Sequence, residues 1–360
     1  MNASEASSKR TAVVVGATGI MGRAITEALA KESQWNVIAL SRSGESVPGA
    51  DQAIAVDLLD PENARRQLLP VAGTTHLFFA AYQPQPTLAE EVAPNRALLV
   101  NAIEGLEAAG SPLEHVILVT GAKYYGVHLG PTPSPAREEQ SRHLGPNFQY
   151  AQEDYLRSRT DAMWRWTHLI STHLTGFATG NPMNLALAIG VYASIIRELG
   201  LCLYFPGSRA AFDAMTQIVD ADQVGQAVVW SATSEAASNE VFNIANGDPI
   251  RWSQLWPEIA AYFGVQTGGP RPLPLASTMP EHSDLWRRLA QKHGLKYPDL
   301  ARLVNWKFLE FVVSIEYDIV LALGKIRRAG FTQHPDTMSG FRNRFDEYIT
   351  QGVLPKVPLR

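Results

Sequence analysis

The sequence predicts an α/β fold: a doubly wound parallel sheet with a smaller, mainly helical C-terminal cap. Two observations predict it. Segments typical of buried strands alternate with helical segments through the first half of the chain, and the pattern turns helical after Asn246-Gly247-Asp248. Parallel strands joined by helices bind ligands at their carboxyl ends, so we expect the functional site there, under the cap.

The first strand pattern is an apolar run ending at Val15, and it leads into Gly16-x-x-Gly19-x-x-Gly22 and a helical segment. In such a turn the first glycine allows the tight bend and the second lets the backbone approach a pyrophosphate. The third allows close packing of a helix whose N-terminal N–H groups face the anion. A second apolar run ends at Leu40, at the distance expected for a Rossmann-type dinucleotide site. A glycine-rich turn without a ligand is the alternative.

The end of the second strand indicates which dinucleotide binds. An NAD site needs an acidic residue there for the ribose hydroxyls, whereas this chain has Ser41-Arg42-Ser43. A guanidinium and two hydroxyls suit a 2′-phosphate, so we predict NADPH/NADP+ as the cofactor. A solvated arginine at a strand end is the alternative. Asp57 ends the third expected strand (52–58), where it either contacts adenine or caps a helix.

Composition excludes several other classes of protein. The 360 residues are 46% apolar and 18% charged with a net charge of −4, which gives no reason to expect a nucleic acid or an anionic membrane as partner. The single cysteine, Cys202, excludes an internal disulfide, and the nine histidines lack metal-ligand spacing, so we expect no metal. We find no secretory signal, and the longest nearly uncharged apolar segment (183–196) is too short to span a bilayer. A soluble cytoplasmic protein is the expectation.

The rest of the chain continues the strand and helix alternation. We expect residues 1–180 to form the NADP(H)-binding domain, with further sheet elements from about 212–247, and residues 181–360 to form most of the cap. The region 126–147, rich in Pro, Gly and charge, is typical of a long functional loop. The remaining expected elements are strands at 76–81, 115–120 and 167–175, and helices at 94–109, 252–263, 281–293 and 304–328.

The expected catalytic residues come from two separate motifs. The glycine spacing resembles extended short-chain dehydrogenases, which usually carry Tyr and Lys four residues apart on one helix. None of the eleven tyrosines here has Lys at that position. A lysine lies instead at the tip of the fifth strand, in Thr120-Gly-Ala-Lys123-Tyr-Tyr, and the chain returns later with Asn147-Phe-Gln-Tyr150-Ala-Gln-Glu-Asp.

These two motifs, TGxKxY and NFxYxxED, resemble those of the progesterone 5β-reductase and iridoid synthase family, which are atypical extended short-chain dehydrogenases. The resemblance implies an oxidoreductase for NADPH-dependent 1,4-reduction of enones and enals, with hydride passing to the β-carbon. By the same resemblance, Tyr150 would hydrogen-bond the carbonyl oxygen and Lys123 would support the enolate charge. Further matches are His76-Leu77-Phe78-Phe79, Gly176-Phe177, Met183-Asn184-Leu185, Val191-Tyr192-Ala193, Ala221-Asp222, Phe242 to Asp248, Trp252 and Trp286.

The chain departs from the family pattern at positions that border nicotinamide and substrate, so these departures bear on the substrate class. Ala80-Ala81-Tyr82 stands where the family usually has a Thr-Trp pair, Ile170-Ser171 replaces Arg-Pro, and Gln149 replaces a tyrosine common in plant members. We expect Glu153 and Asp154 to serve the first turn of their helix rather than to act as bases.

The predicted site therefore has three parts. The catalytic residues are Lys123 and Tyr150, and the substrate wall includes Tyr82 and Phe177. The predicted cofactor contacts are Gly16, Thr18, Gly19, Ile20, Gly22, Ser41, Arg42, Ser43, Asp57, Leu58, Ala80, Thr120, Lys123 and Tyr150.

The expected partner is a small apolar enone or enal, and related folds commonly dimerise, which makes a homodimer an expectation by analogy. Two alternatives stay open. An NADP(H)-dependent carbonyl reductase or epimerase of the extended type is disfavoured by the missing Tyr-Lys spacing. A non-catalytic NADP(H)-binding sensor is disfavoured by the retained Lys123 and Tyr150.

Overall fold

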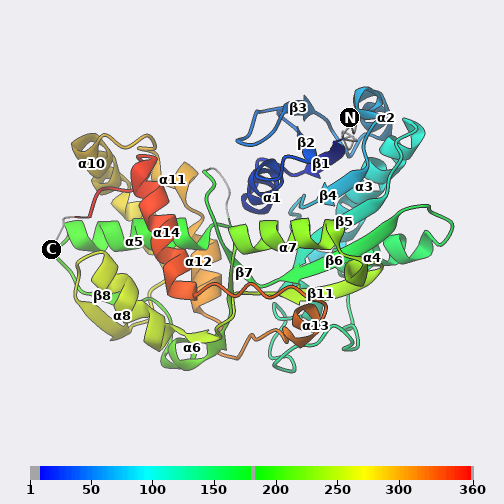
Figure 1. The fold of residues 1–360 in the computed structure, drawn as a ribbon. Helices are drawn as coiled ribbons and strands as arrows, with labels where there is room; N and C mark the ends of the chain where they lie inside the picture. Colours follow the sequence, from blue (N-terminus) through cyan, green and yellow to red (C-terminus); the bar gives the residue numbers. More distant parts are fainter. Residues whose placement is uncertain (1–8, 180–182, 358–360) are drawn as a thin grey trace, which may run out of the picture.

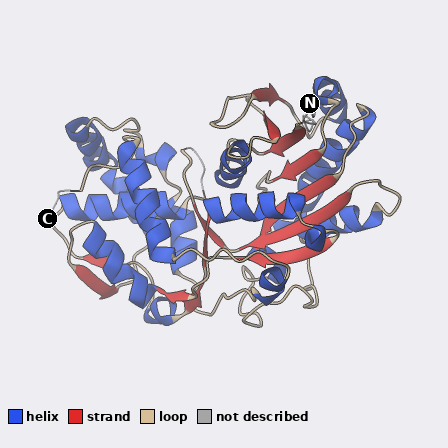
Figure 2. Ribbon diagram, viewed as in Figure 1, coloured by secondary structure: helices blue, strands red, loops and turns tan. Residues whose placement is uncertain are grey.

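The structure is a computed structural model that describes residues 9–179 and 183–357. Its centre is a seven-stranded parallel sheet with the order β11-β6-β5-β4-β1-β2-β3, the strand order of a Rossmann fold (Figures 1 and 2). The strands are β1 (Arg10–Val15), β2 (Trp35–Ser41), β3 (Gln52–Ala55), β4 (His76–Phe79), β5 (His115–Gly121), β6 (Arg165–Ser171) and β11 (Glu240–Ile244). The inner strands are buried on both faces because helices cover both sides.

Helices flank this sheet on its two faces (Figure 1). On one face α1 (Ile20–Ala30) packs against α7 (Ala221–Thr233). On the other, α2 (Pro61–Leu68) and α4 (Phe148–Ser158) pack against α3 (Leu88–Ala108). The expected helix at 94–109 is thus longer at its start, where a Thr87–Glu90 capping box satisfies the free N–H groups of the first turn.

The helical part has a hydrophobic core of its own, beside the sheet in Figure 1. Bulky side chains such as Trp256, Trp286 and Phe345 are fully buried in it. Its helices are α5 (Leu185–Glu198), α6 (Arg209–Asp213), α8 (Trp252–Tyr262), α9 (Leu275–Thr278), α10 (Ser283–His293), α11 (Leu300–Leu303), α12 (Trp306–Val313) and α14 (Thr337–Thr350). Sheet and cap therefore each bury an apolar core of their own.

Within the described residues, three short strand pairs lie outside the main sheet. The strand expected at 167–175 is divided: β6 ends at Ser171, and β7 (His173–Thr175) leaves the main sheet to pair with β10 (Ile218–Asp220). The Thr172 hydroxyl between them donates to the Gln217 carbonyl at 3.0 Å. The other pairs are β9 (Met215–Thr216) with β12 (Ile250–Arg251) and β8 (Leu203–Phe205) with β13 (Thr267–Pro270).

The expectation of one long helix over 304–328 is wrong. Helix α12 ends at Val313, and α13 (Gly324–Arg328) begins only after an extended stretch. In that stretch Ile319 bridges to Thr216 and Leu321 bridges to Ala136, and both apolar side chains are buried. Ile319 and Leu321 are two residues apart and both point inward, which is the spacing of a strand. Backbone partners on both sides of this stretch outweigh its local helical preference.

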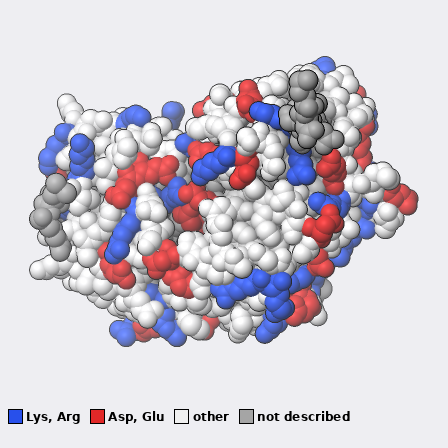
Figure 3. All heavy atoms as spheres, viewed as in Figure 1, with Lys and Arg blue, Asp and Glu red and all other residues white. Residues whose placement is uncertain are grey.

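The same bridge anchors the expected loop at 126–147, because the Ala136 N–H donates to Val320 O at 2.7 Å. Acidic and basic side chains are interspersed over the face in Figure 3, in keeping with the small net charge. Among the described residues, no helix is long and apolar enough to cross a membrane.

Candidate active site

The glycine turn has the geometry that a pyrophosphate site needs. Gly16 follows β1 with φ +80°, and Gly19 precedes α1 without any side chain capping the first N–H groups. A Cβ on Gly22 would lie 2.1 Å from the Gly16 carbonyl oxygen, so this position admits only glycine. A Cβ on Gly16 would press on Ala80 at 3.0 Å, which brings the end of β4 against the turn. The uncapped helix start is therefore open to an anion, and the residues present fit a dinucleotide.

The residues after β2 form a polar turn beside this site. Ser41 Oγ accepts the Gly44 N–H at 3.0 Å and lies 3.3 Å from Ser43 Oγ. Arg42 is exposed, and its guanidinium reaches Gln83 Oε1 at 3.5 Å across the sheet edge. The guanidinium thus retains free N–H groups, as a phosphate ligand requires.

Asp57 lies beyond the end of β3, which stops at Ala55 rather than at residue 58. Its carboxylate accepts the Leu59 N–H at 2.9 Å, and its own N–H donates to Asn63 Oδ1 at 3.0 Å. The structure thus gives Asp57 the turn-forming role, with its exposed carboxylate at the same sheet edge. Leu58 is buried, and its carbonyl accepts an amide hydrogen bond from Asn101 at 2.7 Å.

Lys123 lies in the turn that follows β5, at the carboxyl edge of the sheet. Its ammonium is 3.9 Å from Glu91 Oε2 and 5.7 Å from the centre of the Tyr82 ring. The backbone of this turn is tied to α4, because Asn147 donates to the Lys123 carbonyl at 3.0 Å and also caps that helix. Thr120 is buried just before the turn, and its hydroxyl contacts His168 Nε2 at 2.7 Å.

A small cavity opens beside the Lys123 side chain, between the start of α3 and the start of α4. Burial, followed by the nearby charges of Lys123 and His143, lowers the pKa of the His128 imidazole in its wall to about 4. His128 Nδ1 is buried and, among the described residues, has no hydrogen-bond partner. The cavity is therefore lined by one cation, one carboxylate and one neutral imidazole. Its lining residues are Leu88, Glu91, Lys123, His128, Pro146, Asn147 and Phe148.

Tyr150 is close to Lys123 in the fold, but its hydroxyl is engaged elsewhere. The hydroxyl donates to the Tyr124 carbonyl at 2.5 Å and accepts the His143 N–H at 3.1 Å. The ring lies under the Arg142 guanidinium at 4.7 Å and is almost fully buried. Burial raises the pKa of the phenol. Tyr150 thus holds the backbone at Tyr124, next to Lys123, and the loop at His143. The Lys123 ammonium faces Glu91 rather than the Tyr150 hydroxyl.

The two residues predicted to form the substrate wall, Tyr82 and Phe177, lie in different parts of the structure. Tyr82 lies at Lys123, stacked on Phe148 with ring centres 5.3 Å apart. Phe177 lies instead between α1 and α14, where its ring stacks on Tyr348 at 4.8 Å and the Arg23 guanidinium lies 4.6 Å from it. Ile170 and Ser171 are both buried in β6, and the Ser171 hydroxyl donates to Thr120 O at 2.7 Å.

The expectation that Glu153 and Asp154 serve the first turn of their helix is wrong, because α4 begins at Phe148 and both residues lie in its second turn. Its buried carboxylate contacts His168 Nδ1 at 3.2 Å and Arg157 Nε at 2.7 Å. Burial alone raises the pKa of this group, but hydrogen bonds from His168, Arg157 and Tyr124 outweigh it and lower the pKa to about 2. Asp154 is exposed and pairs with Arg142 at 2.7 Å. The glutamate of the NFxYxxED motif is thus the residue whose buried carboxylate links His168 and Arg157.

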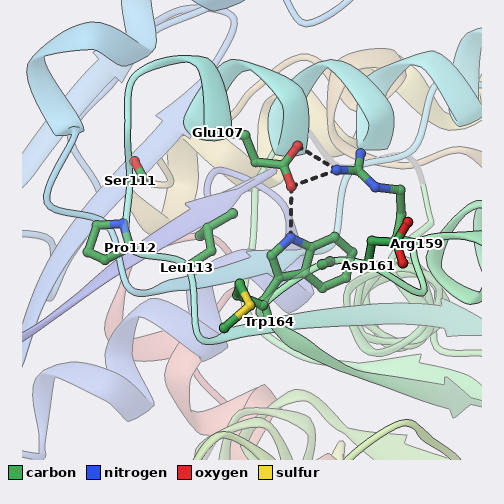
Figure 4. Close-up of a pocket in the computed structure, with 9 residues that line it drawn as sticks. Glu107, Ser111, Pro112, Leu113, Arg159, Asp161 and Trp164 are labelled. Atoms are coloured by element: carbon green, nitrogen blue, oxygen red, sulfur yellow. Dashed lines mark hydrogen bonds and ion pairs between the residues drawn. The ribbon is translucent and has the colours of Figure 1, made fainter.

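A second hollow lies at the opposite end of the sheet (Figure 4). It is formed by residues 111–113, which precede β5, and residues 161–164, which precede β6. Glu107 fills part of it and accepts hydrogen bonds from Arg159 at 2.8 Å and from Trp164 Nε1 at 2.9 Å. Because parallel sheets bind cofactors at their carboxyl edge, this amino-edge hollow is separate from the candidate active site.

Solved structures share this architecture at low sequence identity. A UDP-glucose 4-epimerase from Thermotoga maritima superposes with a TM-score of 0.67 at 16% identity, covering 94% of this chain and 99% of the epimerase. The Bordetella bronchiseptica enzyme WbmG, solved in complex with NAD, gives a TM-score of 0.65 at 15% identity over 98% of both chains. These likenesses establish the fold.

Curated relatives match over almost the whole chain. A short chain dehydrogenase of Penicillium aethiopicum, gsfE, is 31% identical and covers 96% of this chain and all of its own length. Two plant proteins are each 27% identical, over 96% of this chain and 93% of their own length: an (S)-8-oxocitronellyl enol synthase of Camptotheca acuminata and a 3-oxo-Delta(4,5)-steroid 5-beta-reductase of Arabidopsis thaliana.

The model of the PRISE-like Rossmann-fold domain matches residues 59–355, which include the Lys123 turn, the Tyr150 helix and the cap. Together with the seven-stranded sheet and the relatives of full length, this match confirms the resemblance seen in the two motifs. The chain belongs to the PRISE-like Rossmann-fold family.

Proposed function

We propose that this protein is an NADPH-dependent ene-reductase that reduces the C=C bond of small or medium apolar enones or enals. One observation carries the proposal: an ammonium at the tip of β5 lines a small cavity together with Phe148, at the carboxyl edge of a Rossmann-type sheet. The names of the plant relatives, an enol synthase and a steroid 5-beta-reductase, support the same chemistry.

The chain's own residues would hold the cofactor at two places. The uncapped start of α1, reached through the Gly16 turn, receives the pyrophosphate, and Arg42 with the neighbouring hydroxyls receives the 2′-phosphate. When bound, NADPH supplies the hydride that adds to the β-carbon of the substrate.

Reduction places negative charge on the carbonyl oxygen of the substrate, and Lys123 meets that charge. Its ammonium has three N–H donors. One side of the ammonium faces Glu91, so the N–H groups on the other side are left for the substrate oxygen. A proton from solvent water then adds to the α-carbon, which yields the saturated carbonyl. In this proposal Tyr150 becomes the second donor when its hydroxyl exchanges the Tyr124 carbonyl for the substrate oxygen.

The reaction class is tested by product analysis. Purified protein with NADPH and 2-cyclohexen-1-one, or an α,β-unsaturated aldehyde, is expected to oxidise NADPH and release the saturated carbonyl, measured by the absorbance of NADPH and by gas chromatography. An allylic alcohol as product would identify a carbonyl reductase instead. Tight NADPH binding without turnover on a broad panel of enones would identify a sensor.

The cofactor preference is tested at Arg42. Arg42→Ala is expected to raise the Kd for NADPH about 10- to 100-fold and to leave the Kd for NADH unchanged, because a charged hydrogen bond to the 2′-phosphate contributes about 1.5–3 kcal/mol. Fluorescence titration measures both constants. Arg65→Ala is the matched control, since Arg65 is an exposed arginine on α2 paired with Glu62. Equal affinities for the two nucleotides, unchanged by Arg42→Ala, would contradict the preference.

A further inference from the structure

The buried carboxylate of Glu91 has no role in the reduction as proposed above. Glu91 lies in the first turn of α3, and its side chain is only 6% exposed. A carboxylate this buried is costly unless it is paired and hydrogen-bonded. Glu91 has two such partners: the Tyr82 hydroxyl donates to Oε1, and the Lys123 ammonium lies 3.9 Å from Oε2.

We propose that Glu91 is a positioning residue that fixes the Lys123 ammonium at the cavity, and that Tyr82 holds the Glu91 carboxylate in place. This inference rests on the proposed reduction. It adds that Glu91 orients Lys123, the main hydrogen-bond donor to the substrate oxygen. Lysine has a flexible four-carbon stem, so its ammonium needs a fixed partner to stay in one place. The separation of 3.9 Å is an ion-pair distance, which orients the ammonium without consuming all its donors.

The surroundings of Tyr82 support this order of contacts. Its ring is stacked on Phe148 at the start of α4 and lies under Lys123 at 5.7 Å, so it packs against two of the residues that line the cavity. Burial, and then the Glu91 carboxylate, raise the pKa of the phenol, which keeps the hydroxyl protonated as a donor to Glu91. Tyr82 is thus the clamp on Glu91 and packs against Phe148, which lines the cavity.

Glu91→Gln is the direct test, because the amide keeps the size of the side chain and removes its charge. We expect kcat for enone reduction to fall about 10- to 100-fold, through misplacement of the donor, while the KM for NADPH changes little. Glu90→Gln is the matched control: Glu90 is exposed on the same helix, and Gln preserves the capping box with Thr87. Unchanged kcat in Glu91→Gln would overturn the inference.

A double-mutant cycle separates positioning from a general structural effect. If Glu91 acts through Lys123, Glu91→Gln has no further effect on the residual rate of Lys123→Met. An equal fold-loss in both backgrounds would overturn the inference. Should Glu91→Gln fail to fold, Tyr82→Phe, which keeps the ring and removes the hydroxyl, is expected to lower kcat in the same direction by a smaller factor.

A readout independent of activity keeps this inference separate from the proposed function. Reductive methylation of Lys123, followed by mass spectrometry, is expected to be several-fold faster in Glu91→Gln than in the wild type or in Glu90→Gln, because the paired ammonium is released. If the wild type reduces no enone, the proposed function fails while the methylation rates still test the pairing. Equal rates in all three proteins would overturn the pairing itself.

Discussion

Replacing Lys123 with Met is expected to lower kcat for enone reduction by about 10²–10³-fold, with NADPH binding retained. Methionine has a similar length and apolar stem, so it removes the charge with little change in packing. The loss follows because Lys123 is the one cation among the described residues that line the cavity, so the charge that forms on the carbonyl oxygen loses its charged donor. Steady-state kinetics with the enone, together with NADPH titration, measure the two effects separately.

The control for this variant is Lys307→Met, since Lys307 is an exposed lysine on α12 in the cap. Its kcat is expected to equal that of the wild type. A Lys123→Met protein with full turnover would show that the β5 tip does not provide the donor, and the ene-reductase proposal would lose its main support.

Tyr150→Phe complements this experiment. The phenylalanine ring fills the same space but cannot bond the Tyr124 carbonyl or the His143 N–H. If Tyr150 also donates to the substrate, kcat falls by about 10²-fold, as for loss of one oxyanion donor. If it serves only to hold the turn and the loop, the melting temperature falls and kcat changes little.

Gly22→Ala is expected to abolish NADPH binding in the accessible concentration range. The added Cβ would lie 2.1 Å from the Gly16 oxygen and 2.8 Å from Ala17 Cα, and both are backbone atoms of the turn. The turn must shift outward, which removes the N–H groups that face the pyrophosphate. Such overpacking also costs about 1–3 kcal/mol of stability. Titration of NADPH and thermal unfolding of the variant measure these losses.

Gly73→Ala is the matched control for the glycine substitution, because a Cβ there meets no atom within 4 Å. It is expected to bind NADPH like the wild type. Wild-type affinity in Gly22→Ala would mean that the pyrophosphate does not bind at this turn, and the assignment of the cofactor site would be wrong.

The sequence by itself determined the alternation of strands and helices, the glycine turn and the two motifs that carry the family resemblance, because each depends on local spacing. Gly16, Gly19 and Gly22 have roles that follow from backbone sterics within one strand–turn–helix unit. The position of Lys123 at the β5 tip follows in the same way from the end of an apolar run.

Contacts between distant segments were decided only by the tertiary structure. The pairing of Glu91 with Tyr82 and Lys123 joins the loop after β4, helix α3 and the turn after β5, and no sequence spacing encodes it. The burial of Glu153 against His168 and the extended stretch at Ile319 depend likewise on partners far along the chain. Local patterns fix which face a side chain presents, but the partner that it meets depends on how the sheet and the cap fold together.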